Sequence, residues 1–353
     1  MLRGGSWIND ARNVRSANRN DNDPANRNDN IGFRCARAQT RIGWSASEQV
    51  CFHGVAASGR CSPQHDGGRR AGRMAGWPSE GSPACRAPNG VMVVIDASWH
   101  PLAQGVPPAW ASAWGQDRFG VYAAFTLAGV NQRMRWISPG RFQMGSPADE
   151  AGRWDDEGPR HAVAISKGFW LFETACTEAL WQAVTGTPPV PARGAKMPVT
   201  GVSWHDAQSF IERIQVMKPG LDLRLPSEAE WEYACRAGAD TPWSFGTEIT
   251  TEQVCFGARA PVDTGSLPPN PWGLREMHGN VWEWCADHWH NDYRGAPDDG
   301  SAWLDPRASR AADRVLRGGS WIPGARFVRS AARHGAAPAD RDGLFGFRCA
   351  RVQ

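Results

Sequence analysis

The chain has 353 residues, of which 41% are hydrophobic, and a formal net charge of +3 at pH 7. This length suffices for two or three domains and a sizeable buried core. No apolar run approaches the roughly twenty residues that span a bilayer, and the N-terminus lacks the pattern of a signal peptide. We therefore expect no membrane association, with a cytoplasmic location as the default.

Positive charge is concentrated at the N-terminus. Residues 1–90 hold thirteen Arg, no Lys and seven acidic residues, so they contribute +6 and the rest of the chain −3. A basic arm for nucleic acid is one interpretation. However, Arg without Lys among Gly, Ser and Pro is more typical of GC-rich DNA translated in frame, and we expect no nucleic-acid partner. The nine Cys show no metal-ligand spacing, which indicates a reduced protein.

The N-terminal segment recurs at the C-terminus. Residues 2–39 (LRGGSWINDARNVRSANRNDNDPANRNDNIGFRCARAQ) align without a gap with residues 316–353. The first copy contains eight Asn and four Asp, and all twelve are replaced in the second copy. Only two of the other 26 positions differ, Ile31 against Phe345 and Ala38 against Val352. Drift after a simple tandem duplication, the alternative explanation, would also alter the Arg, Gly and Ser positions.

The replacements share one property at the level of codons. All twelve, and also Ile31 to Phe345, can be reached by changing adenines alone; Asn13 to Phe327 is an example. This pattern resembles the template repeat and variable repeat of a diversity-generating retroelement, in which an error-prone reverse transcriptase randomises adenines. The resemblance implies that residues 316–353 are the variable region and residues 1–39 a translated copy of the template.

The segments between the two copies differ in character. Residues 1–39 and the Gly-, Ser- and Arg-rich spacer 40–90 show no regular period and are expected to be disordered. We expect the native start near Met92, a lead-in segment over 91–130, and one domain over 131–353.

Strand and helix signals alternate within the domain. Residues 133–146 read as two strands around Pro-Gly, the pattern of a hairpin, and residues 161–165 and 168–172 as a further strand pair. Helices are expected from Thr177, after a Ser203 cap, and after the Ser227–Glu230 capping box. Short strands are expected within 280–286 and 315–318. Helices beside small antiparallel sheets predict an α+β domain with much irregular structure.

Several motifs in order identify a family resemblance. GRFQMGS, RLPSEAEWEYACRAG, NPWGLREMHGNVWEWCAD, RVLRGGSW and GFRCAR resemble the formylglycine-generating enzyme, or sulfatase-modifying-factor, family from about residue 134 to 351. The resemblance implies a C-type-lectin-like core with added helices and loops. The enzymes of the family oxidise a substrate Cys with copper and O2, using two Cys in the pattern RGGSWxCxxxxC. Those positions are Pro323 and Val328 here, so we expect neither copper nor oxidase activity.

The resemblance also implies a structural calcium site. In the family, the GNxWEW loop binds the ion through oxygen ligands, which suit calcium. The matching positions are the side chains of Glu276 and Glu283 and the carbonyls of Gly279 and Val281. Glu276 replaces a shorter Asn or Asp, and hydrogen bonding of Glu283 to the loop backbone is the alternative.

We therefore predict a non-catalytic protein that displays a diversified ligand-binding surface, with a protein as the ligand; a degenerate copper oxidase is the alternative. Asn codons can become the residue types that make adaptable binding surfaces. The predicted surface comprises the altered positions Pro323, Gly324, Phe327, Ala332, His334, Gly335, Ala336, Ala337, Asp340, Asp342, Gly343, Leu344 and Phe345. Unaltered residues are expected to hold the fold, the Arg through bidentate hydrogen bonds. They are Arg317, Gly318, Gly319, Ser320, Trp321, Arg326, Arg329, Ser330, Arg333, Arg341, Gly346, Phe347 and Arg348.

Overall fold

The structure is a computed structural model that describes residues 108–322 and 324–352, together with four short strands nearer the N-terminus. Two of these, β1 (Leu2–Arg3) and β2 (Arg19–Asn20), pair within a unit formed by residues 1–72. The other two, β3 (Ala84–Arg86) and β4 (Met92–Val94), pair within the second unit, residues 73–353. The disorder expected for 1–39 and 40–90 and the start expected near Met92 otherwise concern positions outside the described residues.

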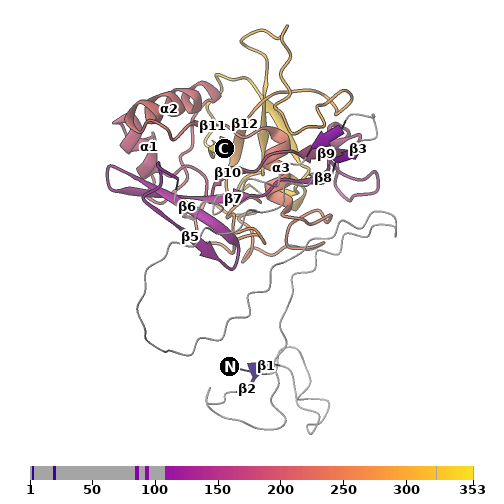
Figure 1. Cartoon of the computed structure of the whole chain (residues 1–353), viewed down its shortest axis with the longest axis horizontal. Helices are drawn as coiled ribbons and strands as arrows, with labels where there is room; N and C mark the ends of the chain where they lie inside the picture. Colours follow the sequence, from indigo (N-terminus) through magenta and orange to yellow (C-terminus); the bar gives the residue numbers. More distant parts are fainter. Residues whose placement is uncertain are drawn as a thin grey trace, which may run out of the picture. The chain divides into compact units, whose positions relative to one another are not determined.

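A six-stranded antiparallel sheet forms one layer of the domain (Figure 1), in the order β11-β16-β10-β7-β6-β5. The described part of the expected lead-in supplies β5 and β6, and the end of the repeat supplies β16. The strands span Ala113–Asp117 (β5), Gly120–Leu127 (β6), Val130–Ile137 (β7), Phe169–Phe172 (β10), Leu223–Arg224 (β11) and Ala350–Val352 (β16).

Strand β10 separates two hydrophobic clusters. Its four side chains alternate between them, because successive residues of a strand point to opposite faces. Phe169 and Leu171 pack with Trp231 in one cluster, whereas Trp170 and Phe172 pack in the other. All four are buried, which explains why this strand is a continuous apolar run rather than an alternating pattern.

The two predicted hairpins are wrong in their pairing, although their strands exist. β7 and β10 pair with each other, and their continuations β8 (Gly140–Met144) and β9 (His161–Ile165) pair in the same antiparallel sense. The four strands thus form two ladders that follow each other along the same two arms. The pairing is interrupted where residues 138–139 stand opposite 166–168, because Pro139 cannot donate a ladder hydrogen bond and the second arm carries one extra residue. Residues 145–160 form the loop that joins β8 to β9.

The three predicted helices are confirmed within about one residue of their caps. α1 (Glu178–Thr185) begins after Thr177 and ends at Gly186, α2 (Trp204–Met217) begins after Ser203, and α3 (Glu228–Arg236) follows Ser227. α1 and α2 lie side by side in Figure 1. Their apolar faces pack in the hydrophobic cluster that contains Trp170 and Phe172. No helix among the described residues is long and apolar enough to cross a membrane. The predicted α+β class is confirmed.

A second, four-stranded sheet contains strands from the repeat. Its order is β14-β13-β12-β15, in which β15 lies parallel to β12 and the other neighbours are antiparallel. Helix α3 contacts β12 and β13, and every residue of this helix is buried. The strands span Trp282–His288 (β12), Arg314–Arg317 (β13), Arg333–Ala336 (β14) and Phe345–Gly346 (β15).

Arg348 links the two sheets. It follows β15, and its guanidinium binds both oxygens of Glu283 on β12 at 2.6 and 2.8 Å. The same guanidinium donates to the carbonyls of Phe172 and Arg275 at 3.1 and 2.9 Å. Both partners of the ion pair are at most 1% exposed, so removing one would leave the other buried and without its counter-charge.

Replacing Arg348 with Met should therefore lower the free energy of unfolding by about 3–5 kcal/mol. Arg341 is a matched control, because it also binds a carboxylate, that of Asp206, through two hydrogen bonds, but its side chain is 59% exposed. Arg341→Met should cost at most about 1 kcal/mol. Denaturant unfolding of both variants measures the difference, and equal losses would contradict the role given to Arg348.

Candidate functional site

The repeat from residue 316 onward has little regular structure of its own. Between β13 and β14 its described residues form one short 3-10 helix, Ala325–Val328, and between β14 and β15 it forms a loop. Such a segment has few backbone ladder bonds, so side chains must fix its path. Gly319 shows how closely it packs: its φ is +75°, and an added Cβ would lie 2.5 Å from the carbonyl oxygen of Phe327.

Four unaltered arginines of the repeat point into the interior. Each is at most 4% exposed, and each meets carboxylates that lie outside the repeat. Arg317 binds Glu228 and Glu232 of α3, Arg329 binds Glu150 and Glu157, Arg333 binds Glu228, and Arg348 binds Glu283. The predicted role of these arginines is confirmed, although Arg326 and Arg341 are exposed.

Every nitrogen of the Arg333 guanidinium donates a hydrogen bond. Its Nε and Nη2 donate to the two oxygens of Glu228 at 2.6 and 2.9 Å. Its Nη1 donates to the carbonyls of Asp156 and His290 at 2.7 and 3.1 Å. Burial alone would lower the pKa of Arg333, but the Glu228 carboxylate outweighs that effect and raises it above the usual range. The charge is therefore permanent.

The same arginines hold a loop that does not belong to the repeat. Arg329 donates to Glu157 at 2.8 Å and to the carbonyl of Gly152 at 3.0 Å, while Arg333 holds the carbonyl of Asp156. These contacts attach the hairpin-tip loop, residues 145–160, to the repeat. As a result, Trp154 packs on Phe327 with the ring centroids 5.2 Å apart.

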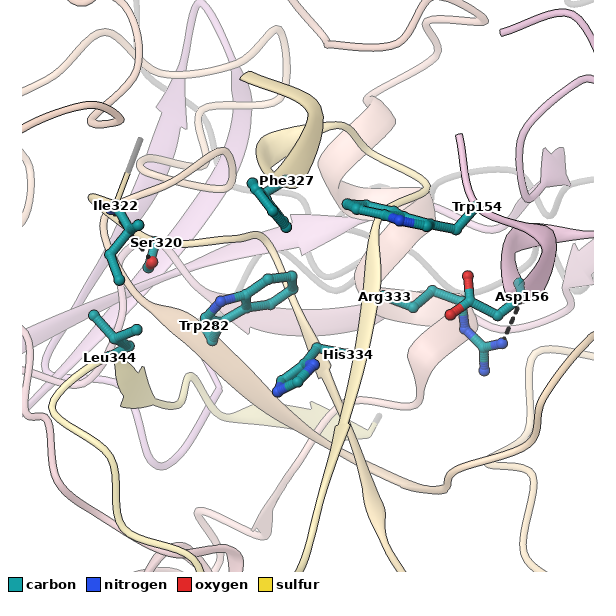
Figure 2. Close-up of a pocket in the computed structure, with 9 residues that line it drawn as sticks. All are labelled: Trp154, Asp156, Trp282, Ser320, Ile322, Phe327, Arg333, His334 and Leu344. Carbon is teal, nitrogen blue, oxygen red and sulfur yellow. Dashed lines mark hydrogen bonds between the residues drawn. The ribbon is translucent and has the colours of Figure 1, made fainter. Parts of the chain in front are cut away.

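A pocket of about 370 Å³ opens between this loop and the repeat (Figure 2). Aromatic rings form most of its walls, Phe327 and Trp154 on one side and Trp282 and His334 on the other. Trp282 and His334 lie 5.5 Å apart between ring centroids. The lining residues are Trp154, Asp156, Trp282, Ser320, Ile322, Phe327, Arg333, His334 and Leu344.

Three of the predicted surface residues, Phe327, His334 and Leu344, meet in this pocket. They come from the 3-10 helix, from β14 and from the loop before β15, so the fold gathers them from separate parts of the repeat. Outside the pocket, Gly324, Gly335 and Ala337 are partly exposed, and Asp340, Asp342 and Gly343 are exposed. Pro323 lies outside the described residues.

The expectation that every altered position faces solvent is wrong at three of them. Ala332 is 0% exposed, Ala336 8% and Phe345 7%. Ala332 belongs to the buried run from Val328 to Arg333, and Phe345 packs edge-on against Trp284 at 5.4 Å. The comparison of the two copies identifies the altered positions, whereas burial depends on tertiary packing, so the altered and the exposed positions need not coincide.

Residues outside the repeat complete the pocket, and the repeat comparison could not identify them. Trp154 and Asp156 lie in the hairpin-tip loop, where no sequence signal distinguishes them. Trp282 lies in the GNVWEW motif, is 8% exposed and lines the pocket. Ser320 and Ile322 are unaltered residues of the repeat.

Both predicted calcium side chains have protein partners. Glu283 binds Arg348 and also accepts a hydrogen bond from the Trp231 indole at 2.8 Å. Glu276 accepts from the amides of Gly265 and Leu267, and burial raises its pKa. The carbonyl of Gly279 accepts from the amide of Val281 at 2.9 Å. The orientation of both carboxylates is thus explained without an ion, and calcium binding stays a prediction.

One of the two positions of the family's copper thiols, Val328, ends the 3-10 helix with its side chain fully buried. The other, Pro323, lies outside the described residues. The cysteines in the described part of the chain are all buried at other positions, and burial raises the pKa of Cys235 to about 12. A neutral buried thiol is a poor ligand for copper.

His278 forms a hydrogen bond with the backbone of the repeat. Its Nδ1 lies 2.8 Å from the carbonyl of Val328, which can only accept, and its Nε2 accepts from the amide of Ser244 at 3.1 Å. These two partners require the neutral ring with the proton on Nδ1. Burial, together with the charge of Arg236, lowers the pKa of His278 from 6.5 to about 4 despite the hydrogen bond to Val328.

Replacing the buried Ala332 with Asn, its counterpart in the first copy, should cost about 2–4 kcal/mol of stability, because the amide overfills the site and lacks partners. His334→Asn is the matched control at an exposed position and should change stability by no more than about 0.5 kcal/mol. Thermal and denaturant unfolding of the two variants provides the measurement. Equal tolerance at both positions would show that the burial of Ala332 is unimportant.

Acidification should destabilise the protein through His278. The unfolded chain binds a proton here near pH 6.5, whereas the folded chain does so only near pH 4, so stability is lost as the pH falls through that window. Between pH 7 and pH 5 the loss should be about 2 kcal/mol. His278→Gln keeps a donor and an acceptor without this titration, and its stability should fall by that much less over the same interval. Identical pH slopes for the two proteins would contradict the assignment.

The chain is similar in sequence to a known domain family and to several known proteins. Residues 1–39 and 123–353 match the sulfatase-modifying factor enzyme 1-like domain. A formylglycine-generating enzyme from Thermomonospora curvata is 33% identical over 214 residues, which are 54% of this chain and 66% of the enzyme. A serine/threonine-protein kinase pkn1 from Chlamydia pneumoniae is 38% identical over 159 residues, 44% of this chain but only 24% of the kinase. The chain thus spans about a quarter of one relative and about two thirds of the other.

Two solved structures resemble the domain. PvdO from Pseudomonas aeruginosa is 31% identical with a TM-score of 0.59, and the match covers 69% of this chain and 99% of PvdO. Variable protein 1 of Treponema denticola is 25% identical with a TM-score of 0.54, and the match covers 66% and 99% of the respective chains. The C-type-lectin-like type of fold that the motifs predict is confirmed.

Proposed function

This chain belongs to the sulfatase-modifying factor enzyme 1-like family, and on that premise we propose that it is a non-catalytic ligand-binding protein whose C-terminal surface is diversified by adenine-specific mutagenesis. The observation that carries the proposal is the meeting of Phe327, His334 and Leu344, three altered positions, in one pocket. The ligand we infer is a protein, because exposed apolar side chains, Phe327 at 38% and Ile322 at 40%, border the pocket.

The distribution of unaltered residues supports the same function. Arg317, Arg329, Arg333 and Arg348 all point inward to carboxylates, so the residues that fix the repeat are those that do not change. A surface that changes needs such a separation, because random substitution of a structural residue would usually unfold the protein. The Treponema denticola neighbour, which is named a variable protein, supports the proposal as well.

The family also contains named enzymes, and fold alone does not decide between the two functions. The composition of the site favours binding. Copper(I) is held by soft thiolates, and this chain has Pro323 and Val328 where the resemblance places the two Cys. The oxidase remains the second candidate, through the shared family.

Sequencing residues 316–353 and the neighbouring DNA from sibling isolates tests the proposal most directly. We expect variation confined to the thirteen altered positions, at codons that contain adenine in the first copy, and a reverse-transcriptase gene nearby. The inward-pointing arginines should be the same in every isolate. Variation spread evenly over the repeat would contradict the proposal, as would purified protein that binds copper(I) and consumes O2 with a Cys peptide.

A further inference from the structure

One carboxylate oxygen at the end of the pocket has no hydrogen-bond partner. Oδ1 of Asp156 is buried, and none of the described residues donates to it. Burying a carboxylate oxygen without a donor is costly, so a cation placed beside the Asp156 carboxylate would stabilise its charged form. Asp156 lines the pocket beside Arg333, as Figure 2 shows.

Arg333 does not supply that hydrogen bond. Its donors are directed to Glu228 and to two carbonyls, including the backbone carbonyl of Asp156 itself. The Glu228 carboxylate that Arg333 binds is shared with Arg317. No ion pair joins the Asp156 side chain to a cationic group in the described part of the protein, and burial raises the pKa of Asp156 although the nearby charge of Arg333 lowers it.

The walls beside this carboxylate are aromatic. The Trp154–Phe327 and Trp282–His334 pairs present ring faces and edges to the space between them. Ring faces attract cations, most strongly those of Trp. Trp154 already shows this preference, because the guanidinium of Arg326 lies 4.1 Å from its ring centroid. An apolar stem with a cationic head fits such a space better than an anion would.

We propose that the pocket binds a lysine or arginine side chain of the partner protein. Its aliphatic stem would lie between the aromatic rings, and its charged head would lie against the Asp156 carboxylate, which lines the pocket. The volume of about 370 Å³ is at the lower end of the range for ligand pockets, which suits a single long side chain. This inference rests on the proposed binding function and specifies the chemistry of the ligand.

The position of these residues in the chain adds a consequence. Asp156, Trp154 and Trp282 lie outside the repeat and are not subject to its mutagenesis. Phe327, His334 and Leu344 do vary. The constant residues would then recognise the cation in every variant, while the varying residues would select among partners by what surrounds it.

The direct test measures binding of N-acetyl-arginine amide to the full chain, with N-acetyl-citrulline amide as the neutral probe of nearly the same shape. Tryptophan indole NMR signals report binding at the pocket. We expect the arginine probe to bind at least five-fold more tightly than the citrulline probe. Asp156→Asn should abolish this preference. Asp155→Asn, a change in the same 3-10 helix at a fully exposed side chain, should leave it intact.

Equal binding of the two probes, no binding of either, or an unchanged preference in Asp156→Asn would each overturn the inference. Unfolding curves of the two variants establish that both are folded. A different measurement, the sequences of sibling isolates, tests the proposed function. If sibling isolates vary only at the altered positions but the arginine probe is not preferred, the protein is still a diversified binder and only the cationic ligand is wrong.

Discussion

Four arginines of the repeat enter the interior of the protein, and each requires a carboxylate there. A buried guanidinium without a partner would cost several kcal/mol. The repeat can therefore adopt its path only because Glu228, Glu283 and the acidic residues of the hairpin-tip loop are positioned to bind these side chains. The fully buried helix α3 supplies two of these acids from consecutive turns, Glu228 and Glu232. A segment with little regular structure is thereby given one conformation by charge-assisted hydrogen bonds.

In this arrangement, one set of side chains fixes the backbone of the repeat, and another set is exposed on its surface. Each buried guanidinium binds more than one element, as Arg329 does when it joins the 3-10 helix of the repeat to Glu150 and Glu157. The positions between the arginines can therefore change without loosening the backbone, provided that they point outward. Phe327 and His334 meet that condition, and Ala332 does not. The surface that the altered positions form is consequently smaller than the full set of altered positions.

Hydrogen bonds between residues close in sequence made the helices predictable, whereas features that depend on distant contacts could not be predicted. Thr177, Ser203 and Ser227 mark helix starts through hydrogen bonds within three residues, so they act regardless of the rest of the fold. Strand pairing depends on distant partners, and Pro139 reads as a turn although it lies between two ladders along the same arm.

The comparison of the two copies predicted three pocket residues, because the altered positions can be found by alignment alone. It could not predict Trp154 or Asp156, which reach the pocket only through tertiary contacts with Arg329 and Arg333.

The inward arginines, and not the altered residues, determine the fold of the repeat. Two libraries can be compared by resistance to proteolysis, one randomised at Phe327, His334, Asp340, Asp342 and Leu344 and the other at Arg317, Arg329, Arg333 and Arg348. We expect most members of the first library to stay folded and almost none of the second. Similar survival in the two libraries would contradict it.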